Sequence, residues 1–200
     1  HVDFHEQYIN NPYYFAPAAE PYHEVITDWQ REFQTSIGKN NAKYFDENGW
    51  LYFTKEFFDL LYPSYGDSYP TYNGSIGMTY EQAGHGMAGL GILTHEEDTL
   101  TLVDRIKHHT VTSLSTIEIT SLNADKVISE FGNYFSESIS NPKGEYKSYI
   151  VKAENGKDKL SSLMAFLDKQ KISYGKVSSK KDVKGFDYLK NQDGSTSINE

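Results

Sequence analysis

The chain has 200 residues, of which 38% are hydrophobic and 14% aromatic, a composition that favours a globular protein and excludes intrinsic disorder. It contains no cysteine, so a disulfide scaffold, a cysteine-based zinc site and a thiol nucleophile are all excluded. Its formal net charge of −9 argues against nucleic acid as a partner, because such proteins need a basic face, and no apolar run approaches the roughly 20 residues of a membrane span.

The first segment expected to be regular is "VDFHEQ", residues 2–7, where Val2 and Phe4 alternate with Asp3 and His5 as in a strand. Residues 20–40 then predict an amphipathic helix that ends near Gly38. Its apolar residues recur at spacings of three and four: Val25, Ile26, Trp29, Phe33 and Ile37.

Two short strands are expected next, in "GWLYFTK" and "GMTYEQAG", because these aromatic and β-branched runs are bounded by glycine. A long helix follows from near Thr99, and it either continues or restarts after Asn123. Four residues of this helix are predicted to face inward: Leu102, Ile106, Leu114 and Ile117. Together these elements predict an α/β fold, with part of a mixed β-sheet flanked by helices.

Charge divides the chain unevenly. Residues 1–140 hold 7 basic and 20 acidic residues, whereas residues 141–200 hold 12 basic and 8 acidic ones. The change falls in "SESISNPKGEYKS", a linker-like stretch, so we expect one domain over residues 1–140 and a second unit over 143–200, with the boundary near Pro142. Residues 146–177 read as strand, helix and strand, which predicts a small β-α-β unit.

Two residues stand out as candidates for chemistry. His5 lies near the end of a predicted strand, where α/β proteins place ligands, although a single histidine is more often only solvated or hydrogen-bonded. Glu81 lies inside an apolar strand, where burial would raise its pKa toward that of a general base. Before Glu81 runs a loop with Tyr62, Tyr65, Tyr69 and Tyr72, which either binds a ligand or covers the edge of the core.

Complete catalytic signatures are absent from the sequence: it has no H-E-x-x-H, no G-x-S-x-G, no phosphate-binding G-x-x-x-x-G-K-[ST] and no H-x-x-E. However, the ordered series "VDFHEQ", residues 10–84 and "LTLVDRIKHHTVTSLSTIEI" resembles the C-terminal half of a zinc carboxypeptidase domain of the carboxypeptidase A-like family, in the large bacterial secreted type. The resemblance covers about residues 1–137.

The resemblance implies a role for each candidate. His5 would be the second histidine ligand of a catalytic zinc, and Glu81, in "MTYEQ", the general base and acid. Tyr62, with Gly66 and Ser68 at offsets four and six, would close over the substrate, with Tyr65 as the alternative and Tyr69 lining the pocket. The family's aspartate and tryptophan after that serine are replaced here by "YPTY".

The implied function is zinc-dependent hydrolysis of C-terminal peptide bonds in a peptide or protein substrate, in the periplasm or outside the cell. Because H-x-x-E is missing, the chain is expected to be an incomplete fragment with little activity alone, and its exposed sheet edges would allow self-association. Two alternatives remain. One is a non-catalytic module that binds peptide or cell-wall fragments through its tyrosines, and the other is an independent enzyme that holds a metal with His5, Glu6, Glu81 and His85.

Overall fold

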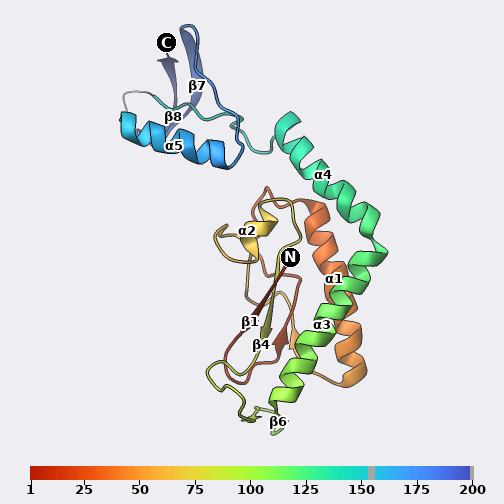
Figure 1. Ribbon diagram of the computed structural model, residues 1–200. Helices are drawn as coiled ribbons and strands as arrows, with labels where there is room; N and C mark the ends of the chain where they lie inside the picture. The colour runs from red at the N-terminus through yellow and green to blue at the C-terminus, as the bar shows by residue number, and fades with distance from the viewer. Residues whose placement is uncertain (153–155, 199–200) are drawn as a thin grey trace. The chain divides into compact units, whose positions relative to one another are not determined.

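The computed structural model describes residues 1–152 and 156–198, and it divides into two compact units, His1–Lys143 and Gly144–Glu200. Both units mix helices with strands, so the α/β class holds at this coarse level (Figure 1). The elements of the first unit are β1 (Val2–Glu6), β2 (Tyr13–Tyr14), α1 (Asp28–Asn48), β3 (Tyr52–Phe53), α2 (Ser68–Thr71), β4 (Met78–Gln82), β5 (Ile92–Leu93), β6 (Thr99–Leu100), α3 (Leu102–Leu122) and α4 (Ala124–Ser140).

The first unit is built on a mixed sheet with the strand order β1-β4-β2-β3. β1 runs parallel to β4, β2 runs antiparallel to β4, and β3 is parallel to β2. α1 and α3 pack against each other on one side of this sheet (Figure 1), joined by Asn40, which donates to the backbone and side chain of Ser115. Between helices and sheet lies an aromatic core: Tyr13, Phe15, Ala16, Phe33, Ile37, Phe45, Ile76, Met78 and Tyr80.

The first helix was predicted in the right region but with wrong ends. α1 begins at Asp28, after Thr27 and Gln30 form a reciprocal capping box, and it continues through Gly38 to Asn48. Gly38 does not end the helix. It allows the helix to pack closely against the backbone at Ala16, because a Cβ atom at this position would lie 2.2 Å from the carbonyl oxygen of Ala16. The helix ends at Gly49, which adopts the left-handed conformation at φ 67°.

The predicted inward face of α3 is wrong. Leu102, Ile106, Leu114 and Ile117 are 44% to 64% exposed, whereas the buried residues of α3 are Arg105, His108, Thr112 and Ser115. The physical reason is that the surface beneath α3 is polar: Thr112 Oγ1 lies 3.1 Å from the Tyr13 hydroxyl, and His108 bonds Gln82. The helix is interrupted at Asn123, and a new helix, α4, begins at Ala124. Of the two alternatives, a helix that continues or one that restarts, the second is therefore correct.

The second unit is not a β-α-β unit in the part of the chain that the structure describes. Residues 146–152 form no strand, and α5 (Lys157–Lys169) is followed by a hairpin of β7 (Lys181–Asp187) and β8 (Gln192–Ile198). The hairpin pairs antiparallel along its whole length, from Lys181 opposite Ile198 to Asp187 opposite Gln192. The second predicted strand, residues 172–177, is not formed either. The hairpin lies further along the chain, and its turn contains Asn191 at φ 52°, a conformation that asparagine tolerates.

Candidate active site

The candidate site lies at the carboxyl ends of the parallel strands β1 and β4. Their register places His5 directly beside Glu81 and Asp3 beside Thr79. Because side chains alternate along a strand, these four residues share one face of the sheet. The structure therefore brings together the two residues that the sequence singled out, at the strand ends where parallel sheets bind ligands.

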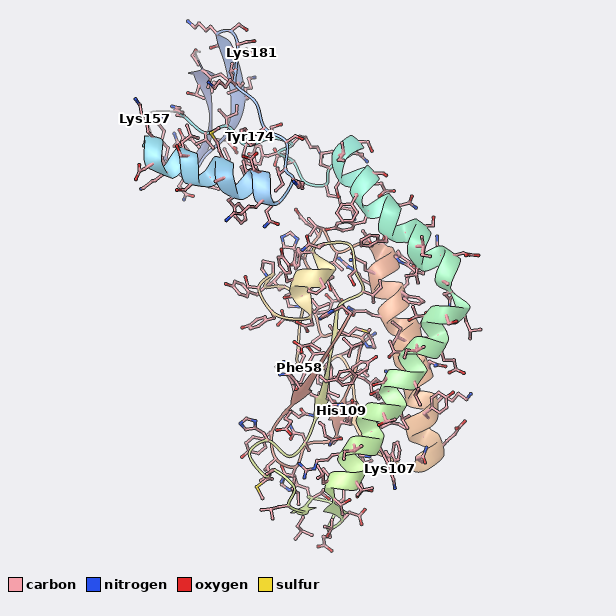
Figure 2. All side chains as sticks on the ribbon, viewed as in Figure 1. Phe58, Lys107, His109, Lys157, Tyr174 and Lys181 are labelled. Atoms are coloured by element: carbon pink, nitrogen blue, oxygen red, sulfur yellow. The ribbon has the colours of Figure 1, made fainter. Side chains whose placement is uncertain are left out.

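The opposite face of the same two strands belongs to the helix side. Phe4, paired with Tyr80, packs edge-to-face against it and against His109 of α3, with ring centroids 5.7 Å and 5.0 Å apart. Figure 2 labels His109, which points from α3 toward the strands, and its Nδ1 lies 2.8 Å from the Tyr13 hydroxyl. This packing fixes β1 and β4 and thereby fixes the direction of His5 and Glu81.

Glu81 is the buried member of the site, with 6% of its surface exposed. Burial raises its pKa to about 7; the cationic form of His5 opposes the rise, and the nearby carboxylates of Asp3 and Asp67 add to it. Its Oε2 is buried and has no hydrogen-bond partner among the described residues. A buried carboxyl group with a pKa near neutral can act as a base or an acid toward a bound molecule.

Tyr14 supplies much of the apolar surroundings of Glu81. It is the antiparallel partner of Glu81 on β2, so its side chain projects from the same face. Its ring packs on Phe58, with centroids 4.6 Å apart, and its hydroxyl donates to the carbonyl of Phe58, which is labelled in Figure 2. Aromatic surface beside a carboxyl group excludes water and so accounts for the raised pKa.

Asp67 joins the site from the tyrosine-rich loop, although it was not among the residues predicted from the sequence. Its carboxylate is buried, accepting from the Thr79 hydroxyl at 2.8 Å and from the Ser68 backbone N–H at 2.7 Å. Next to it, Gly66 passes so close to β1 that a Cβ atom would lie 2.0 Å from Asp3 Oδ2. The only sequence signal was its place before the short helix α2, where aspartate is a common cap, and that signal indicates structure before function.

His5 is the accessible member of the site. Its Nε2 lies 3.2 Å from Asp3 Oδ2, while more than half of the His5 side chain is exposed. A carboxylate this close to one ring nitrogen attracts the imidazole and leaves the other nitrogen available for a ligand. His5 and Asp3 therefore form a pair at the open side of Glu81.

The three predicted substrate-contacting tyrosines lie on the loop that carries Asp67. Tyr62, Tyr65 and Tyr69 are 53% to 64% exposed, and the rings of Tyr62 and Tyr65 contact each other at 5.6 Å. Ser68 holds their backbone in place: its hydroxyl donates to the Tyr62 carbonyl at 2.6 Å and accepts from the Tyr65 N–H at 3.1 Å. The loop is thus anchored while its tyrosine rings face solvent.

The hypothesis of a self-contained metal site finds no support in the positions of its residues. Glu6 follows His5 on a strand, so it projects from the opposite face, where its charge acts on His109. His85 lies past the end of β4, where its N–H donates to the Gln7 carbonyl. Over residues 1–152 and 156–198, no group of three histidine, aspartate or glutamate side chains is placed to hold a metal ion.

Comparison with known proteins identifies no family. No family model matches the sequence, and no curated protein and no solved structure matches it either. The resemblance to zinc carboxypeptidases therefore remains a prediction from the motifs. A search of the helices in the described residues finds none that is long and apolar enough to cross a membrane.

Proposed function

We propose that this chain carries part of a peptide-hydrolysing site of the zinc carboxypeptidase kind, with Glu81 as general base and acid and His5 as a metal ligand. The observation that carries the proposal is the register of β1 and β4, which puts a buried glutamate beside an accessible histidine at the carboxyl ends of parallel strands. The substrate would be a peptide or protein with a free C-terminus, and a secreted or periplasmic location follows from the same resemblance.

Glu81 suits the two proton transfers of peptide hydrolysis. With a pKa of about 7, it is partly ionised at neutral pH. The carboxylate would take a proton from water as the water oxygen bonds to the scissile carbonyl carbon. It would then give this proton to the amine nitrogen as the carbon–nitrogen bond breaks, which regenerates the carboxylate.

The described residues do not by themselves fit a catalytic zinc ion. Such a site uses three protein ligands with one open position, and no group of three suitable side chains exists among the described residues. In this proposal His5 contributes one ligand, and the described residues do not supply the other two. We therefore expect the 200-residue chain alone to hydrolyse peptides very slowly.

The exposed tyrosines favour a second candidate function. Three large amphipathic rings on one anchored loop form a surface suited to binding peptides or cell-wall fragments without chemistry. In that case Glu81 would not be required for binding. The two functions differ in whether zinc reaches His5 and whether Glu81 is required.

The decisive experiment is an NMR titration of the chain with Zn²⁺, following the histidine rings and the Glu81 carboxyl carbon. Because the described residues supply one ligand and not three, zinc should bind only weakly at His5. Bound zinc should nevertheless shift the His5 ring signals and lower the Glu81 pKa below 7, because a nearby cation stabilises the carboxylate. His5→Ala should abolish both effects, whereas the matched variant His85→Ala should retain them. The same response in His5→Ala would show that zinc binds elsewhere and would overturn the proposal.

A second experiment separates hydrolysis from binding. The chain with Zn²⁺ is incubated with N-acylated dipeptides that end in a free acid or in an amide. Slow cleavage of the free acid alone, lost in Glu81→Gln, supports the peptidase. Binding of the peptides that survives Glu81→Gln and is lost on alanine substitution of Tyr62, Tyr65 and Tyr69, without cleavage, supports the binding module.

A further inference from the structure

The sheet of the first unit has two edges of different length. β3 forms one edge with two residues, Tyr52–Phe53, whereas β1 forms the other with five, Val2–Glu6. Natural proteins keep an edge strand short or protect it with proline, lysine or a bulge, because a long open edge pairs with other chains. β1 contains neither proline nor lysine, and its register with β4 is continuous. β1 is therefore the edge of this sheet that can accept another strand.

The ladder between β1 and β4 shows which backbone groups of β1 point outward. The N–H of Gln7, directly after β1, donates to the carbonyl of Gln82 on β4. Because consecutive residues of a strand direct their backbone groups to opposite sides, the odd-numbered residues bond β4. The N–H and C=O groups of Val2, Phe4 and Glu6 therefore point away from β4. Residues 1–152 and 156–198 provide no hydrogen-bond partner for these outward groups.

A second copy of β1, running antiparallel, fits this edge best in one register. With Phe4 opposite Phe4 of the second copy, Val2 lies opposite Glu6, and every outward residue exchanges two backbone hydrogen bonds with its partner. Asp3 then lies opposite His5 of the second copy, in a non-hydrogen-bonded pair with Cα atoms about 4.5 Å apart, where opposite charges are favourable. A register with Asp3 or His5 opposite itself forms two hydrogen-bonded pairs instead of three and sets like groups against each other.

Apolar side chains along the same edge would also be covered. Phe4 is 45% exposed although it packs on Tyr80 and His109, and two Phe4 rings opposite each other form a favourable cross-strand pair. On α3, Leu102 and Ile106 lie within about 60° of His109 around the helix, given 100° per residue. They are 44% and 56% exposed. Apolar surface thus continues from the edge strand onto the helix that packs on it.

We propose that two copies of this chain pair through β1 into a symmetric dimer, with Phe4 at the twofold axis and Asp3 of each copy opposite His5 of the other. A twofold axis perpendicular to the sheet makes the two β1 strands antiparallel, which is the direction that pairs their outward groups. Each candidate active site would then contain Asp3 of the second copy beside its own His5. The self-association expected from the sequence would use this one edge. The inference does not depend on the proposed peptidase function.

Disulfide cross-linking tests the register directly, because the chain has no cysteine of its own. Phe4→Cys should form covalent dimers on mild oxidation, since opposite residues of a hydrogen-bonded pair have Cα atoms about 5.5 Å apart, within the range of a disulfide. Asp3→Cys and His5→Cys should each cross-link poorly alone and efficiently when mixed, because these positions face each other between copies. Tyr8→Cys, at an exposed position beyond β1, controls for random collision. Equal cross-linking of Tyr8→Cys and Phe4→Cys, or no gain on mixing the other two, would overturn the proposal.

Sedimentation equilibrium of the 200-residue chain tests the dimer without a cross-link. We expect the mass to rise with protein concentration from 22.8 kDa toward twice this value. Phe4→Lys should weaken the dimer by about tenfold, because it replaces an aromatic pair with two like charges opposite each other. Ile139→Lys puts the same charge at an exposed apolar position of α4 and should leave the dissociation constant unchanged. A mass of 22.8 kDa up to a protein concentration of about 1 mM, or a dimer lost in Ile139→Lys and kept in Phe4→Lys, would contradict pairing through β1.

Discussion

Both faces of the β1–β4 pair bury polar side chains, but the hydrogen bonding of these side chains differs. On the helix side, the Tyr80 hydroxyl bonds Asn41 and Thr116, and the Tyr13 hydroxyl bonds Thr112 and His109. On the other side, Glu81 is equally buried, yet its Oε2 lacks a partner in the described structure. Buried atoms without a partner occur on both sides, since Asn41 Oδ1 and His108 Nε2 on the helix side also lack one in the described structure. What distinguishes the open face is that its unpartnered atom belongs to a carboxyl group whose pKa burial raises to about 7.

The largest effect is expected on the helix side. Tyr80 is fully buried and packs in the main core cluster, so Tyr80→Ala should lower the free energy of unfolding by about 3–5 kcal/mol, as for other large aromatic residues. Urea denaturation measures this loss. Tyr80→Phe keeps the ring and removes only the hydroxyl bonds, so it should cost about 1–3 kcal/mol. A loss below 1 kcal/mol in Tyr80→Ala would contradict the assignment of this face to the core.

Glu81→Gln should act in the opposite direction and depend on pH. The pKa of Glu81 in the folded state, about 7, lies above its ordinary value of 4.5, so the folded form binds the proton more tightly than the unfolded form. Wild-type stability due to this group is therefore complete below about pH 4.5 and falls as pH rises to about 7. Glutamine is neutral throughout, so relative to wild type the variant should gain on the order of 2 kcal/mol between pH 4.5 and pH 8.

Urea denaturation of both proteins at pH 4.5 and pH 8 measures this difference. The matched variant Glu137→Gln removes an exposed carboxylate of α4, and its stability relative to wild type should not change between the two pH values. The same difference between wild type and Glu81→Gln at both pH values would show that Glu81 is ionised without cost. The open face of the sheet would then lack a buried carboxyl group with a raised pKa.

A smaller effect is expected where the loop crosses the open face. Gly66→Ala places a methyl group against Asp3 Oδ2, and moving this side chain should cost about 1 kcal/mol. The cost should largely disappear in an Asp3→Ala background, because the colliding atoms are gone. A double-mutant cycle by urea denaturation checks this, and full additivity of the two changes would place the loop away from β1.

The sequence predicted the elements that depend on local patterns and missed those set by tertiary contacts. Alternation in "VDFHEQ" located β1, and the glycine-bounded run "GMTYEQAG" located β4. The position of Glu81 in an apolar strand indicated a raised pKa. The pairing of β1 with β4 joins segments more than seventy residues apart, so no local pattern contains it. Asp67 was missed for the same reason, since its bond to Thr79 exists only after the loop folds onto the sheet.

Gly38 and the second unit show the limits of single-residue signals. A glycine after a periodic run usually ends a helix, but Gly38 lies within α1 because the backbone at Ala16 occupies the space of a side chain. In the second unit, a strand-like alternation at residues 146–152 found no partner strand in the described structure, whereas the turn near Asn191 produced a hairpin. Strands require partners, and periodicity alone does not supply them.

The smallest effect is expected on the face of α3 that was wrongly predicted to point inward. Leu114 lies on the exposed side of α3, so Leu114→Gln should change the free energy of unfolding by no more than about 0.5 kcal/mol, whereas a buried leucine would lose about 2–5 kcal/mol on truncation. Thr112, two residues earlier, is fully buried with its hydroxyl bonded to Tyr13, so Thr112→Leu should cost about 1–3 kcal/mol through overpacking. Urea denaturation of the pair decides which side of α3 faces the sheet. If Leu114→Gln proved the more costly, α3 would be rotated, and His108 would no longer reach Gln82.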